Sequence, residues 1–197
     1  MQLTYPEMPP MSWASVESVA RETLAAVFRN ENDFFSQGAM LRLFEGGLWE
    51  PLGIGYGVEE LPFGEDAYFN FDTDEIILAP HTYDGLRRDD GRPRFTLAHE
   101  IGHGVLHREF MRSVGRGNSR ATRLKRTEIL PYRDPECQAN RFASEFLMPA
   151  HFVKPFVEQG AGPTQVASKF KTSLSAASIK CSEFARRRPT QNSLIKF

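Results

Sequence analysis

Apolar side chains recur at the spacing of an amphipathic helix in several parts of the chain. Residues 12–29 and 95–108 both show this spacing, and Ser12 stands where it can cap the first segment. Residues 34–48 predict another helix, which Gly46-Gly47 would break. The first half of the chain is therefore expected to contain several helices.

The strongest helix signal lies further along the chain. Asp134 and Pro135 combine a capping residue with proline in the first turn, and Pro149 stops the segment. Two shorter helices are predicted at about 164–170 and 173–186, and no internal repeat is visible.

Between these helical regions the pattern changes to short apolar segments. Residues 67–71 and 75–79 are aromatic and β-branched, and Asp72-Thr73-Asp74 separates them, as is typical of a hairpin. The polar residues 82–94 and the basic residues 111–134 are both predicted to form loops. A small region of strands should therefore lie between helices.

Composition places the chain among ordinary globular proteins. Its 197 residues are 41% apolar and 25% charged, which excludes a disordered, collagen-like or coiled-coil chain. No apolar stretch approaches the roughly 20 residues needed to cross a bilayer, and the N-terminus lacks the features of a secretory signal. With only two cysteines, the chain is expected to be cytoplasmic, with reduced thiols.

The formal net charge of −1 conceals an uneven distribution. Residues 1–91 hold 17 acidic and five basic residues, whereas residues 92–197 hold eight acidic and 19 basic residues. Such a split indicates either a nucleic-acid-binding half or two halves that pack together. Because the boundary falls just before the helix at 95–108, we expect one folded unit.

One pentapeptide carries recognisable chemistry: His99-Glu100-Ile101-Gly102-His103. On a helix, the two histidines lie on one face about one turn apart, where one cation can bind both. Zinc takes such ligands and favours a tetrahedral site, and Glu100 projects beside it, where it can accept a proton from the attacking water. Gly102 costs about 1 kcal/mol relative to alanine, so another backbone or a substrate should come close there.

A catalytic zinc needs a third protein ligand. The downstream candidates are His107, Glu109, Glu128, Asp134, Glu136, Glu145 and His151. A straight helix cannot place His107 around the same ion as His99 and His103, so His107 should contact a ligand or the substrate. Glu136 is better placed, in the first turn of a well-capped helix, although the helix dipole alone would also favour glutamate there. Asn140, one turn later, can hydrogen-bond a ligand or a substrate carbonyl.

Two blocks of the sequence stand out together. Residues 94–103 read RFTLAHEIGH, and residues 136–149 read ECQANRFASEFLMP. They resemble, in the same order, the RFTLAHExGH core and the ExxANxFAxxLLMP block of the ImmA/IrrE family of metallo-endopeptidases. Phe146 stands where leucine is common in that family.

The resemblance implies a compact zincin-like α+β unit, with a small, mostly antiparallel sheet beside the ligand helices. It also implies three zinc ligands and a general base, namely His99, His103, Glu136 and Glu100. Similar proteins are cytosolic regulatory proteases that cut helix-turn-helix repressors, so such a repressor is the expected partner. We expect a catalytic domain over residues 1–157 and a small helical cap over 158–197.

The sequence leaves three questions open: which residue stabilises the oxyanion, what the basic segment does, and whether the C-terminal helices bind DNA. A donor that stabilises the oxyanion is needed, and the candidates are His107, Tyr132 and Asn140. The basic residues at 111–134 either attract an acidic partner to the cleft or form a solvated loop. The basic C-terminal helices, with Lys169, Lys171, Lys180 and Arg186–Arg188, would suit a metal-stabilised module that binds DNA or a repressor without cleavage. We expect instead a helical cap with a solvated basic end, and no direct contact with nucleic acid or membrane.

Overall fold

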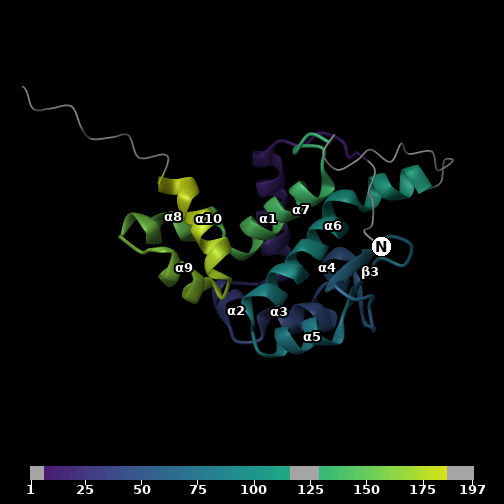
Figure 1. The fold of residues 1–197 in the computed structure, drawn as a ribbon, viewed down its shortest axis with the longest axis horizontal. Helices are drawn as coiled ribbons and strands as arrows, with labels where there is room; N and C mark the ends of the chain where they lie inside the picture. Colours follow the sequence, from purple (N-terminus) through teal and green to yellow (C-terminus); the bar gives the residue numbers. More distant parts are fainter. Residues whose placement is uncertain (1–6, 116–128, 186–197) are drawn as a thin grey trace, which may run out of the picture.

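A computed structural model describes residues 7–115 and 129–185 of the chain, and Figure 1 shows its fold. Its elements, in chain order, are α1 (Trp13–Val27), α2 (Glu31–Phe35), α3 (Ala39–Arg42), the π-helical turn η1 (Leu43–Gly47), α4 (Trp49–Leu52), β1 (Gly55–Val58), β2 (Ala67–Asn70), β3 (Glu75–Leu78), α5 (Pro80–Arg87), α6 (Gly91–Gly115), α7 (Pro135–Leu147), α8 (Ala150–Glu158), α9 (Pro163–Phe170) and α10 (Leu174–Ala185). The fold is α+β and zincin-like, as predicted. None of the helices in the described ranges is long and apolar enough to cross a membrane.

The three strands form a small mixed sheet with the order β1-β3-β2. β2 and β3 make the predicted antiparallel hairpin, with Phe69 opposite Ile76, whereas β1 pairs with β3 in parallel. The sheet is therefore half antiparallel, not mostly antiparallel. The reason is that the connection at 59–66 places β2 two positions away from β1 in the sheet. β3 then fills the position between them, where it runs antiparallel to β2 and parallel to β1.

The long helix α6 crosses the centre of the molecule, with α7 and α1 along one side and the sheet on another (Figure 1). Two glycines allow this close packing. A Cβ atom on Gly102 would lie 3.0 Å from a ring carbon of Phe142 in α7, and one on Gly104 would lie 2.5 Å from the ring of Phe69 in β2. The expected close approach at Gly102 is thus made by α7.

One predicted loop is wrong, and a second is wrong at its beginning. Residues 82–94 contain most of α5 and the first turn of α6, with Asp89 in a left-handed conformation between them. The apolar signal is weak because α5 buries only Thr82, Gly85 and Leu86. The predicted loop at 111–134 begins with the last turn of α6, and its residues 116–128 lie outside the described ranges.

Two helical predictions also need correction. The single helix expected at 34–48 is instead three short segments, α2, α3 and η1, and Gly46 has a φ of 147° within the last of them. α8 was not predicted, because Pro155 reads as a helix breaker. Its apolar side chains nevertheless pack against the core.

The last three helices gather at one end of the molecule, on the left of Figure 1. They are joined to the central helices by polar contacts: Lys180 in α10 pairs with Glu145 in α7, and the guanidinium of Arg94 in α6 donates to the carbonyl of Lys171 after α9. Gly91 also lies against the α9–α10 turn, since a Cβ atom there would meet the backbone of Thr172 at 2.7 Å.

Candidate metal centre

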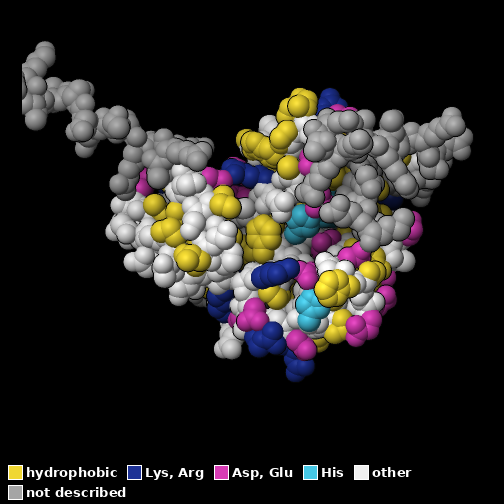
Figure 2. Space-filling view, viewed as in Figure 1, with side chains coloured by type: hydrophobic (Ala, Val, Ile, Leu, Met, Phe, Trp, Pro, Cys, Tyr) yellow, Lys and Arg dark blue, Asp and Glu magenta, His cyan; other side chains and the backbone are white. Residues whose placement is uncertain are grey.

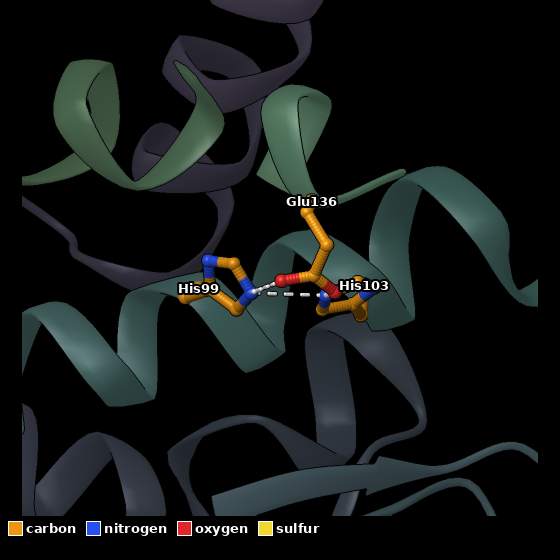
Figure 3. Close-up of side chains that lie close together, drawn as sticks. All are labelled: His99, His103 and Glu136. Atoms are coloured by element: carbon orange, nitrogen blue, oxygen red, sulfur yellow. Dashed lines mark hydrogen bonds and ion pairs between the residues drawn. The ribbon is translucent and has the colours of Figure 1, made fainter. Parts of the chain in front are cut away.

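Two neighbouring helices bring three ligand-type side chains to one point (Figure 3). The Nε2 atoms of His99 and His103, both on α6, lie 3.0 Å apart. The carboxylate of Glu136, from α7, places its oxygens 3.5 Å from Nε2 of His99 and 3.3 Å from Nε2 of His103. In the part of the chain that the structure describes, these residues form a group able to hold a metal ion.

The ligand atoms of the three residues lie close enough together to share one metal ion. Ligands about 2.0–2.1 Å from a tetrahedral zinc lie about 3.3 Å from one another. The two imidazole nitrogens are 3.0 Å apart, and each lies near a different oxygen of Glu136, His103 at 3.3 Å from Oε1 and His99 at 3.5 Å from Oε2. Two imidazoles and one carboxylate are also a common donor set for catalytic zinc.

The first turn of α7 sets the position of Glu136. Asp134 caps this helix, because its side chain accepts a hydrogen bond from the backbone N–H of Glu136 at 2.9 Å. Burial would raise the pKa of Glu136, but hydrogen bonds and charges from His103 and His99 outweigh burial and hold that pKa far below its usual range. Burial likewise opposes charge on His99, yet Glu136 and Glu100 raise the pKa of its imidazole. The site thus stabilises a carboxylate beside positive charge.

Glu100 lies next to the three ligand-type residues and is almost fully buried. Burial raises the pKa of its carboxyl group, while the charges of His103 and His99 act in the opposite direction. The backbone N–H of Phe69, in β2, donates a hydrogen bond to this group. A carboxyl group with a raised pKa accepts a proton more readily than an exposed glutamate does.

The other predicted site residues occupy different places. His107 lies behind His103, with their Nδ1 atoms 3.0 Å apart. Burial, together with the charge of His103, lowers the pKa of His107 to about 3. Asn140 places Oδ1 at 3.1 Å from Nδ1 of His99. Tyr132 has a half-exposed side chain, and its carbonyl accepts from the amide of Gln138 at 2.8 Å.

The remaining ligand candidates lie elsewhere. Glu109 is 86% exposed and faces Arg112, Asp134 caps α7, Glu145 is buried against Lys180, and His151 is exposed on α8. Glu128 lies outside the described residues. Among the candidates that the structure describes, Glu136 is the one that reaches the histidine pair.

Two contributors to the site were not predicted from sequence. One is the N–H of Phe69, a backbone group that no residue pattern reveals. The other is Gln138, which accepts from or donates to His107 at 2.9 Å. Gln138 could have been noticed because it lies one turn before Phe142, on the apolar face of α7, where an uncharged polar residue needs a partner.

Comparison with known proteins agrees with the two sequence blocks. Residues 86–182 match the model of the Peptidase M78 family, described as the IrrE N-terminal-like domain. This part of the chain belongs to the ImmA/IrrE family. The matched range includes α6 and α7, which carry the three ligand-type residues, and this ImmA/IrrE region continues through α9 into α10.

One solved structure shows the same fold at low sequence identity. A Mycobacterium tuberculosis transcriptional regulator is similar over 89% of this chain, with a TM-score of 0.56 and 18% identity. The chain spans about half of that protein, 48% of its length. No curated protein matches the chain.

Proposed function

We propose that this chain is a zinc-dependent endopeptidase. The observation that carries the proposal is the meeting of His99, His103 and Glu136, whose ligand atoms lie within 4.8 Å of one another, with the buried Glu100 beside them. The side chains of His99 and Glu136 are 15% and 29% exposed, so both are open to solvent. Figure 2 shows that histidine and acidic side chains lie near one another on one face of the molecule. A peptide can therefore reach the centre from solvent.

Each site residue has a chemical task in this proposal. His99, His103 and Glu136 would hold zinc, which when bound polarises a carbonyl and acidifies water. Glu100 takes the proton of the attacking water and passes it to the leaving amine. Its raised pKa favours the first transfer, and the hydrogen bond from Phe69 keeps the carboxylate in place.

The positions of the three candidate residues reduce the choice of the group that stabilises the oxyanion. His107 is buried behind His103, so it cannot contact a substrate. Asn140 is exposed and turns its oxygen to His99, which leaves its amide N–H groups available to donate. We favour Asn140, with Tyr132 as the second candidate.

The proposed substrate is a helix-turn-helix transcriptional repressor in the cytoplasm. Membership of the ImmA/IrrE family supports this proposal. The C-terminal helices would then serve as a cap on the catalytic domain, with the boundary near residue 157.

The described residues give little support to a DNA-binding module. Lys180 is buried, Lys171 lies 2.7 Å from Asp89, and Lys169 lies 4.6 Å from the ring centre of Phe156. Lys180 and Lys171 are thus held in ion pairs within the fold, and the exposed Lys169 packs over an aromatic ring. Arg186–Arg188 lie outside the described residues.

The test is Glu100→Gln. We expect the zinc-loaded variant to cleave a helix-turn-helix repressor that the unmodified chain cleaves about 10²- to 10⁴-fold more slowly than the unmodified chain does, because the proton acceptor is lost. Zinc content is measured in the same samples. The matched control is Glu109→Gln, on the exposed side of the same helix, which should cleave normally. Undiminished cleavage by zinc-loaded Glu100→Gln would refute the mechanism.

A further inference from the structure

Gln138 has an orientation that its neighbours force upon it. Its Nε2 donates to the backbone carbonyls of Pro9 at 3.2 Å and Tyr132 at 2.8 Å. Carbonyl oxygens only accept hydrogen bonds, so the amide N–H groups must face them. The side chain is fully buried, and its Oε1 therefore faces His107.

This orientation determines which nitrogen of His107 carries a proton. Nε2 of His107 lies 2.9 Å from Oε1 of Gln138, an atom that only accepts, so Nε2 must be the N–H. A neutral imidazole has one N–H, which leaves Nδ1 of His107 as an acceptor.

The acceptor at Nδ1 of His107 in turn determines which nitrogen of His103 carries a proton. Nδ1 of His103 lies 3.0 Å from Nδ1 of His107, so His103 must donate in this hydrogen bond. Its proton is then on Nδ1, and the lone pair of Nε2 points toward His99 and Glu136. Zinc binds the unprotonated nitrogen of a neutral imidazole.

We propose that Gln138 and His107 are positioning residues that hold His103 in the tautomer required for zinc binding. The inference rests on the proposed function, because it assumes that His103 is a zinc ligand. In this chain of hydrogen bonds, His103 donates to His107 and His107 donates to Gln138. The order of donors is fixed because Gln138 must donate to the backbone carbonyls of Pro9 and Tyr132. His99 is held differently, by the exposed Asn140, whose amide can rotate.

Zinc affinity, measured by competition with a chromophoric chelator, tests the proposal. His107→Leu removes the acceptor next to His103, and we expect zinc to bind about 10- to 100-fold more weakly. His107→Asn keeps an oxygen near the position of Nδ1 and should recover most of the affinity. Gln138→Leu removes the acceptor for the N–H at Nε2 of His107. His107 can then carry its proton on Nδ1 and donate to His103, which should also weaken zinc binding. Phe146→Leu, which is buried on the same helix as Gln138, should bind zinc normally.

Nitrogen NMR of the zinc-loaded chain provides a readout that a merely structural role would not produce. We expect one proton on Nδ1 of His103, with coupling across the hydrogen bond to Nδ1 of His107, and another proton on Nε2 of His107. A proton on Nδ1 of His107 would overturn the proposal, as would normal zinc affinity in folded His107→Leu. If the unmodified chain binds no zinc, the proposed function fails; if it binds zinc and the variants bind equally well, this inference alone fails.

Discussion

Nζ of Lys180 lies 2.6 Å from Oε2 of Glu145, and both side chains are almost completely excluded from solvent. The same carboxylate accepts from Arg21 in α1 at 3.1 Å and from the backbone N–H of Ala150 at the start of α8 at 3.0 Å. Four helices therefore meet at one buried glutamate. Lys180, which from sequence alone adds to a basic surface, is an internal residue.

Replacing Lys180 with methionine should destabilise the fold by about 3–5 kcal/mol, because it leaves a buried carboxylate without its closest partner. The measurement is urea-induced unfolding at neutral pH. The control is Lys154→Met, since Lys154 pairs with Glu158 at 4.0 Å on the surface, and its loss should cost no more than about 1 kcal/mol. Equal effects of the two substitutions would contradict the prediction.

Asp89 should make stability depend on pH. Burial would raise the pKa of its carboxyl group, but hydrogen bonds from Lys171 and the N–H of Gly38, with the charge of Arg94, hold that pKa below its ordinary value. A lowered pKa in the folded state means that the contribution is present above the unfolded value and is lost as pH falls through the folded value.

The variant for this test is Asp89→Asn, because asparagine tolerates the left-handed backbone at this position. The free energy of unfolding should be lower than that of the unmodified chain at pH 7. The difference should shrink as pH falls from about 4 toward the lowered pKa of the folded state, because the unfolded chain binds the proton first. A difference that stays constant from pH 7 to pH 3 would show that the charge of Asp89 is not responsible.

Alanine at Gly104 should destabilise the fold, although alanine is the better helix former by about 1 kcal/mol. The new Cβ would lie 2.5 Å from the ring of Phe69 and 2.9 Å from Ile54, so the helix and the sheet must separate. We expect a loss of about 1–3 kcal/mol in chemical unfolding. Gly102→Ala, with a closest contact of 3.0 Å, should cost less. A larger loss of stability for Gly102→Ala than for Gly104→Ala would contradict the prediction, because it would show that the sheet moves away from α6 more easily than α7 does.

Zinc should raise the melting temperature of the unmodified chain but not of Glu136→Gln, if Glu136 is the third ligand. Zinc at 100 times its dissociation constant adds about 2.7 kcal/mol to the stability of a protein that binds it only when folded. The chelator EDTA should reverse the shift. Glu183→Gln serves as a control for the loss of a partly buried glutamate far from the site. An equal zinc-induced shift in Glu136→Gln would exclude Glu136 as a ligand.

The grouping of the two histidines was predictable because it depends on local geometry, whereas Glu136 was singled out by the family resemblance. Helical periodicity places His99 and His103 on one face, and the cap at Asp134 with Pro135 fixes where Glu136 begins its helix. Local sequence patterns cannot predict contacts between segments that are far apart in the sequence. The strand paired with β3 on its other side, and the N–H that contacts Glu100, both depend on how distant segments are packed.

The errors in secondary structure have a similar origin. α5 lies in a polar segment and buries few side chains, and α8 contains Pro155 in its interior, so the composition of each segment argues against a helix. Tertiary contacts stabilise both helices. Lys180 shows the same limit for charge, because a lysine appears solvent-exposed in a sequence until its partner Glu145 is known.

The carbonyls that orient Gln138 belong to the main chain of Pro9 and Tyr132. Any amino acid that follows the same backbone path offers the same oxygen, so the proton arrangement does not depend on which side chains stand at these two positions. Among related sequences, the inheritance of this arrangement should therefore appear as joint retention of histidine and glutamine at positions 107 and 138. Homologues that have lost one of the two should have lost the other, or should hold their metal in another way.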